Sequence, residues 1–155
     1  MSRGAKIKKK SIESDPIYKS RVVTRVINKV MLDGKKSTAR GIVYDVIAEF
    51  NEDRDEGVKL FEDAIKNIMP KQEVRTRRVG GANYQVPVPL KHDRAEGLAI
   101  RWLVDVARKK KGIDMRKALF NELKAALNHE GDAINKRDTV HKMADANKAF
   151  SHLRW

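Results

Sequence analysis

The sequence predicts a mainly α-helical fold: a single domain of about six helices, with one extended β-hairpin inserted between helices three and four. Three observations lead to this prediction. Apolar residues recur at helical spacing through most of the chain, and a stretch at about 72–90 replaces that spacing with β-type residues and two glycines. No internal repeat or composition shift marks a second domain. A chain of 155 residues can bury about 68–70% of its unfolded surface, so one core is feasible.

Charge and composition narrow the class of function. The chain has 34 Lys and Arg residues against 21 Asp and Glu residues, a formal net charge of +13. Such an excess is tolerated most easily when a polyanion neutralises it, which favours a nucleic-acid partner. The absence of cysteine excludes disulfides, thiolate nucleophiles and cysteine-ligated zinc. No apolar run approaches the roughly 18 residues of a membrane span and no signal peptide is present, so we expect a cytoplasmic protein without a membrane partner.

Residues 1–11 are predicted to form a basic N-terminal arm, and residues 12–155 the helical domain. The arm contains no acidic residue, and its cation density favours a segment that becomes ordered on phosphate. Its basic residues are Arg3, Lys6, Lys8, Lys9 and Lys10.

The first three helices follow from apolar periodicity. The first contains the apolar residues of 22–31 and is expected to stop at Gly34. The second is expected from about Ser37 to Phe50. The third contains the apolar residues of 58–69 and is ended by Pro70.

The connections between these helices differ in charge. Lys35 and Lys36 precede the second helix, and a helix N-terminus is a favourable place for a backbone phosphate. The Gly-Lys-Lys-Ser run there is not a nucleotide-binding loop, because the required earlier glycine is missing and a helix precedes it. The acidic cluster after the second helix is interpreted as a solvated turn that faces away from nucleic acid, towards solvent or a basic protein neighbour. Its members are Glu49, Glu52, Asp53, Asp55 and Glu56.

The predicted hairpin has the composition of an arm that contacts a polyanion. Gly80 and Gly81 supply the positive φ angles of a tight turn. Pro87 and Pro89 cannot donate ladder hydrogen bonds, so the second strand has an open edge. An isolated two-stranded hairpin is marginally stable and gains order from what it packs on. The arm presents Tyr84 on its return strand, and its arginines are Arg75, Arg77 and Arg78.

Three further helices complete the domain. The fourth is expected from about Arg94 to Lys110, with Trp102 on its apolar stripe and therefore in the core. The fifth covers about 114–128, with Asp114 as its N-cap. The sixth covers about 132–150, and its thin apolar stripe of Val140, Met143, Ala144 and Phe150 indicates a helix that depends on a partner. Cations of the fourth helix and its C-terminal end that lie off the stripe are Arg94, Arg101, Arg108, Lys109, Lys110 and Lys111.

No pattern predicts catalysis, a cofactor or a metal site. An enzyme needs several groups converging in one cleft. The four histidines lack the His-x-x-x-His spacing that puts two ligands on one helix face, and no Gly-x-Ser-x-Gly motif is present. We therefore interpret them as surface residues: His92, His129, His141 and His152.

Taken in order, several motifs resemble the bacterial family of small-subunit ribosomal protein seven. They are Asp15-Pro16-Ile17-Tyr18, Val26-Ile27-Asn28-Lys29-Val30-Met31, Asp33-Gly34-Lys35-Lys36-Ser37, Arg77-Arg78-Val79-Gly80-Gly81, Tyr84-Gln85-Val86-Pro87-Val88, Leu98-Ala99-Ile100-Arg101-Trp102-Leu103, and Met143-Ala144-Asp145-Ala146-Asn147-Lys148-Ala149-Phe150 with His152, Arg154 and Trp155. The resemblance spans essentially the whole chain. The chain departs from the family pattern at Phe120 in the fifth helix, at Pro89 in the return strand and at Leu153 near the C-terminus.

The resemblance implies a structural RNA-binding protein and no enzyme. Members of this family bind the 3′ major domain of 16S rRNA early in assembly of the subunit head, lie near the exit-site tRNA, and work as monomers among other small-subunit proteins. The resemblance further implies that rRNA is contacted by the basic arm, by Lys35 and Lys36, by the hairpin arginines and by the cations of helix four. Residues expected near tRNA and messenger are Arg78, Gly80, Gly81, Tyr84, Lys142 and Arg154.

Two alternatives stay open at this point. An architectural DNA-binding protein would use the same basic ribbon as a minor-groove arm, and competition between duplex DNA and rRNA separates the two. The terminal Trp155 either packs back on the core or meets a ligand.

Overall fold

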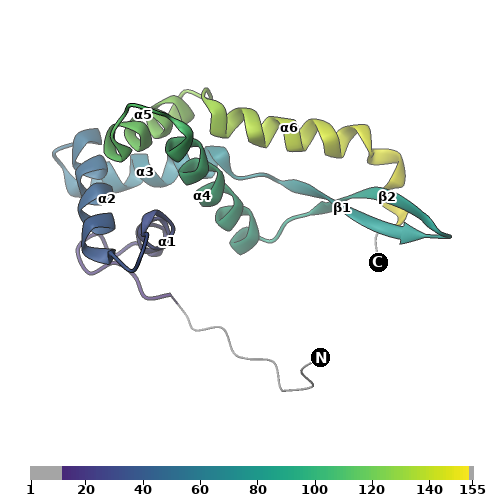
Figure 1. The fold of residues 1–155 in the computed structure, drawn as a ribbon, viewed down its shortest axis with the longest axis horizontal. Helices are drawn as coiled ribbons and strands as arrows, with labels where there is room; N and C mark the ends of the chain where they lie inside the picture. The colour runs from purple at the N-terminus through teal and green to yellow at the C-terminus, as the bar shows by residue number, and fades with distance from the viewer. Residues whose placement is uncertain (1–11, 154–155) are drawn as a thin grey trace, which may run out of the picture.

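The computed structural model describes residues 12–153. Over this range the chain forms six α-helices, a two-stranded antiparallel sheet and a final 3₁₀ helix, which confirms the predicted fold class. Figure 1 shows helices α1 to α5 gathered at one end and the hairpin projecting away from them, with α6 running beside it. The elements are α1 (Arg21–Val30), α2 (Lys36–Phe50), α3 (Arg54–Ile68), β1 (Gln72–Val79), β2 (Ala82–Pro89), α4 (His92–Lys109), α5 (Met115–Leu127), α6 (Asp132–Ala146) and η1 (Lys148–Leu153).

The apolar stripes predicted from periodicity meet in one core. Phe61 of α3 is fully buried at its centre, and Leu103 of α4 and Leu123 of α5 pack into the same cluster. Trp102, predicted to lie in the core, packs against it but is only half-buried. Among residues 12–153, none of the helices has the length and apolar character that crossing a bilayer requires.

The departure at Phe120 is accommodated by an aromatic contact at the edge of the core. The rings of Phe120 in α5 and Phe50 at the end of α2 lie 4.8 Å apart between centroids. The ammonium group of Lys124 lies 5.9 Å from the centroid of the Phe120 ring. These contacts show how a large residue is accommodated on this helix.

The acids of the expected turn are divided between the end of α2, the short connection after it and the first turn of α3. Asp53 is the N-cap, and its carboxylate accepts a hydrogen bond of 3.0 Å from the backbone N–H of Asp55. Asp55 and Glu56 lie in the first helical turn, where negative charge is favourable beside the helix dipole. The prediction of a turn was therefore wrong for Asp55 and Glu56, because acids that suit a solvated turn also suit a helix N-terminus, and wrong for Glu49, which lies in α2. Glu52 and Asp53 lie in the connection between α2 and α3.

Gly34 does not end α1, contrary to expectation. The helix ends at Val30, where Met31 becomes extended and its N–H still reaches the carbonyl of Ile27 at 2.9 Å. Gly34 has φ +73 and follows Asp33 at φ +50, so both lie in the turn that leads into α2. The glycine therefore shapes the approach to Lys35 rather than the end of α1.

The sixth helix is shorter than predicted. It ends at Ala146, the side chain of Asn147 donates back to the carbonyl of Met143 at 2.7 Å, and the chain continues as η1. Met143, expected on the apolar stripe, is 44% exposed. Phe150 lies on η1 and faces the hairpin, so its apolar partner is not the core.

Candidate nucleic-acid interface

The hairpin has the turn that its glycines predict. Gly80 and Gly81 have φ +57 and +88, which is the positive-φ pair of a type I′ turn. The register pairs Arg77 with Tyr84 and Arg78 with Asn83. Because side chains alternate along a strand, Arg78 faces away from the side that Arg77 and Tyr84 share. The arm therefore presents polar groups on both faces near its tip.

At the base of the hairpin, two predicted RNA-contacting arginines meet one carboxylate. Glu73 is 9% exposed, and its two oxygens lie 2.6 Å from Arg75 Nη2 and 3.0 Å from Arg94 Nη2. Burial raises the pKa of the Glu73 carboxyl, but hydrogen bonds and charge from Arg94 and Arg75 outweigh it, so that pKa lies below its ordinary value. We call these three residues the Glu73 cluster; it joins the hairpin to α4.

The structure brings Lys35 to the cations that end α4. A cavity of about 460 Å³ has Lys35 from the α1–α2 loop and Arg108 and Lys110 from the end of α4 among its lining residues. Its remaining wall is largely apolar and includes Leu32 and Ile113, which are 60% and 47% exposed. The α1–α2 loop and the end of α4, which were predicted separately as phosphate contacts, therefore line the same cavity.

Arg108 and Lys110 also have partners within the fold. Arg108 Nη2 donates to the carbonyls of Lys29 and Val30 at 3.1 and 3.2 Å, which satisfies the C-terminal end of α1. Lys110 Nζ lies 2.8 Å from the carboxylate of buried Glu122. Glu122 in turn accepts the N–H of Ala133 at 2.8 Å, and so joins α5 to the start of α6.

A second open groove lies between α4 and α6. Its volume is about 720 Å³, and the half-buried ring of Trp102 forms part of its wall. Arg101 and Lys109, both predicted contacts, are exposed beside it. Lys136 of α6 lines the same groove and was not among the predicted contacts.

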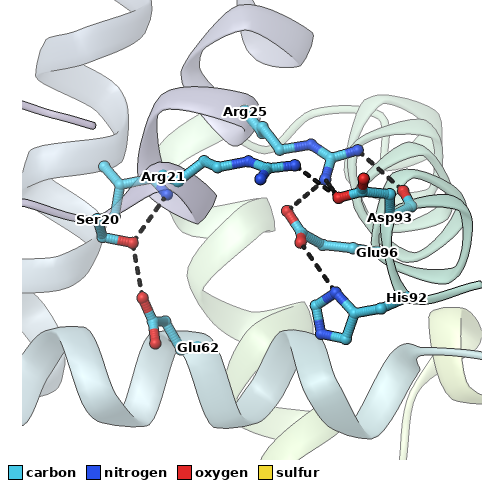
Figure 2. Close-up of polar contacts among 8 residues, drawn as sticks. Ser20, Arg21, Arg25, Glu62, His92, Asp93 and Glu96 are labelled. Atoms are coloured by element: carbon cyan, nitrogen blue, oxygen red, sulfur yellow. Dashed lines mark hydrogen bonds and ion pairs between the residues drawn. The ribbon is translucent and has the colours of Figure 1, made fainter. Parts of the chain in front are cut away.

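Another set of polar residues joins α1 to α4 (Figure 2). Arg25 Nη1 lies 2.8 Å from Glu96, and Arg21 Nη2 lies 2.6 Å from Asp93. The hydrogen bond from Arg21 lowers the pKa of the Asp93 carboxyl. His92, Asp93 and Glu96 bring their ligand atoms within 4.8 Å of one another. The two arginines already neutralise these acids, so the arrangement does not favour a cation.

Beside this network, α1 contributes residues that sequence reasoning missed. Arg25, Asn28 and Lys29 line a shallow pocket of about 270 Å³ together with Arg101. They lie off the apolar stripe of α1, at positions that helical spacing identifies as solvent-facing. That signal was present in the sequence, but it does not distinguish an interface from an ordinary exposed face.

The other predicted residues are placed as follows. Lys36 begins α2, Lys111 follows α4 and Lys142 lies on α6, and all three are exposed. The basic residues of the N-terminal arm, Arg3, Lys6, Lys8, Lys9 and Lys10, lie outside the described residues, as do Arg154 and Trp155.

Comparison with known proteins supports the resemblance in its full extent. The family model described as ribosomal protein S7p/S5e matches residues 2–148. The protein named small ribosomal subunit protein uS7 from Pelagibacter ubique is 50% identical over 156 residues, covering 100% of both chains. Proteins of the same name from Pelotomaculum thermopropionicum and Syntrophomonas wolfei are 49% and 50% identical, again over 100% of both chains. Because the family model matches nearly the whole sequence and the relatives align over their full length, the chain belongs to the ribosomal protein S7p/S5e family.

Proposed function

We propose that this chain binds the 3′ major domain of 16S rRNA, organises the head of the small subunit, and brings the tip of its hairpin near the exit-site tRNA and the messenger. As a member of the family, it is a structural protein of the small ribosomal subunit that binds rRNA among other ribosomal proteins, and it is not an enzyme. Family membership favours this function over the architectural DNA-binding alternative. The finer placement in the head and at the exit site is our proposal.

The observation that supports the proposal best is the separation of two cationic regions. The Lys35 loop and the end of α4 line one cavity on the helical body, whereas the hairpin projects away from that body (Figure 1). A body with a projecting arm can contact more than one segment of folded RNA. Contacts of this kind recognise phosphates and RNA shape rather than base edges.

The predicted contact residues fall into two groups: side chains that already have hydrogen-bond or ion-pair partners within the protein, and side chains that are available to bind RNA. An arginine has five N–H donors, so Arg108 can satisfy two carbonyls and still meet a phosphate. Arg75 and Arg94 share the charge of Glu73, which reduces their attraction for a phosphate. We therefore propose that the main rRNA contacts of the described region are the exposed Lys35, Lys36, Arg78, Arg101, Arg108, Lys109 and Lys111.

The hairpin tip and the C-terminus complete the proposed site. Gly80, Gly81 and Arg78 are exposed at the end of the arm, and Lys142 is exposed on α6. We propose that these residues lie nearest to tRNA and messenger, together with Arg154. The basic arm of residues 1–11 is proposed as a further rRNA contact on the strength of the family resemblance.

Footprinting of the full chain on 16S rRNA tests the proposal. We expect protection confined to the 3′ major domain, and loss of a subset of protected nucleotides in R78A and a different subset in K35A/K36A. Duplex DNA added in excess should not displace the rRNA. Protection in another domain, or equal competition by DNA, would contradict the proposal.

A further inference from the structure

The end of α6 contacts the base of the hairpin through two hydrogen bonds. The ring nitrogen Nε2 of His141 accepts the backbone N–H of Lys71 at 3.0 Å. One turn later, the carboxylate of Asp145 accepts the side-chain amide of Gln72 at 3.1 Å. These bonds join α6 to Lys71 and to Gln72, the first residue of β1, and neither involves the apolar core.

The same segment continues along the hairpin towards its tip. Asn147 lies 3.5 Å from the side-chain oxygen of Gln85, and the ring of Phe150 packs on that of Tyr84 with centroids 5.3 Å apart at 55°. Figure 1 shows α6 running beside the hairpin away from the body, and the yellow end of the chain after α6 turning onto the hairpin. Residues 141–153, which we call the C-terminal segment, therefore contact the hairpin at several positions from its base towards its tip.

These contacts are separate from the packing that stabilises the body. Tyr84 and Phe150 are neither in the buried apolar core cluster nor among the partly buried residues packed against it, which include Trp102 and Phe120. Met143, on the same segment, is exposed. The Tyr84–Phe150 ring pair is therefore a contact between the C-terminal segment and the hairpin that lies apart from the core of the helical body.

We propose that Phe150 is a positioning residue for the RNA-binding hairpin, holding the arm in one orientation through Tyr84. The inference rests on the proposed function of the hairpin. A two-stranded hairpin is marginally ordered alone, and an arm ordered before binding loses less conformational entropy on the RNA. Removing the Phe150 ring should free the arm and weaken rRNA binding about 2- to 10-fold, the range expected for loss of one aromatic pair.

The experiment uses the full chain and two readouts, hydrogen exchange and affinity for an rRNA fragment of the 3′ major domain. In F150A we expect faster exchange of hairpin amides between residues 74 and 88, and unchanged exchange in α3 and α4. The rRNA affinity should fall by the stated factor. F150Y keeps the ring and should restore both readouts, and M143A, at an exposed position of α6, should change neither.

A double-mutant cycle on rRNA affinity separates positioning from direct contact. If Phe150 acts through Tyr84, the variant Y84A/F150A should bind no more weakly than the weaker single variant. Unchanged hairpin exchange in F150A, or additive losses in the double variant, would overturn the proposal. If instead R78A binds rRNA normally while F150A still frees the hairpin, the proposed function of the arm is wrong and the coupling to Phe150 stands.

Discussion

Several cationic side chains of this chain form ion pairs with buried carboxylates within the protein. Glu73, Glu122 and Asp15 are all largely inaccessible, and each has charged or hydrogen-bonding partners from a different element. A buried carboxylate without partners is strongly unfavourable, so these partners contribute to the fold before any RNA is bound. At the residue scale, the consequences are measurable in stability and titration.

The Glu73 cluster gives a stability that depends on pH. The folded-state pKa of Glu73 lies below its unfolded value, so the stabilisation is present above about pH 4.5 and is lost as pH falls through the folded pKa. We expect E73Q to lower the free energy of unfolding by about 0.5–1 kcal/mol at pH 7, because both arginines are partly exposed. Urea unfolding at pH 7 and at pH 3 should show this difference shrinking in acid. The exposed Glu130 provides the control E130Q, and an equal loss in that variant would contradict the assignment.

Tyr44 should titrate well above an ordinary tyrosine. Its hydroxyl donates to both oxygens of Asp15, at 2.9 and 2.8 Å. Burial and that hydrogen bond raise the pKa of Tyr44 to about 12. Phenolate absorbance at 295 nm should therefore contain a component near pH 12 that disappears in Y44F. Stability linked to this group is complete below pH 10 and is lost as pH rises through 12.

The same substitution tests the hydrogen bond itself. Y44F leaves the buried Asp15 carboxylate without that donor, and hydrogen bonds to charged groups contribute about 1.5–3 kcal/mol. We expect a loss of that order in the free energy of unfolding at pH 7. The control Y84F keeps its ring contact with Phe150 and should lose much less. Equal stability of Y44F and the natural chain would show that water replaces the hydroxyl.

At the scale of the element, the close approach of α2 and α3 depends on one glycine. A Cβ at Gly57 would lie 2.9 Å from the carbonyl oxygen of Ile47, whereas Gly41 in α2 has open space around it. We expect G57A to destabilise the chain by about 1–3 kcal/mol through overpacking. G41A should stabilise it by about 0.5–1 kcal/mol through helix propensity. Thermal melts of both variants test this, and two changes of the same sign would refute it.

Helices α1 to α5 were predictable because their apolar periodicity is a local property. The ends of the helices were less predictable. Gly34 is a typical helix stop, but α1 ends at Val30 with Met31 as its C-cap. Asp53 is equally typical of a turn and of a helix N-cap. The end of α6 could not be read from periodicity, because Phe150 packs on Tyr84, a residue distant in sequence. The tight turn at Gly80 and Gly81 was predictable, since few residues adopt two successive positive φ angles.

The sequence predicts which residues of the candidate site are cationic, but not which of them form ion pairs within the protein. Sequence shows that Arg75, Arg94 and Lys110 are cationic, but it cannot show that Glu73 and Glu122 partly neutralise them. These pairs form between elements that only the tertiary fold brings together. An estimate of RNA contacts from charge alone therefore includes side chains that also stabilise the protein.

At the scale of the whole molecule, the full chain has a net charge of +13, and exposed cations of residues 12–153 lie on both the helical body and the projecting hairpin. Self-repulsion of this size is relieved when phosphates replace mobile counterions around the cations. The number of ions released on binding is therefore a property of the complete surface. It reports how many cations actually meet phosphates.

The salt dependence of rRNA affinity measures that number. Each phosphate contact contributes roughly 0.7–0.9 to the slope of log affinity against log salt concentration. If Lys35 and Lys36 each meet a phosphate, K35Q/K36Q should reduce the slope by roughly 1.4–1.8, and K109Q/K111Q by a similar amount. Lys59 is exposed on α3, near the acidic N-terminus of that helix, so K59Q removes a charge without removing a proposed contact. Equal slopes for K59Q and the single variant K35Q would show that the affinity follows net charge, and that the loops around the 460 Å³ cavity are not specific phosphate sites.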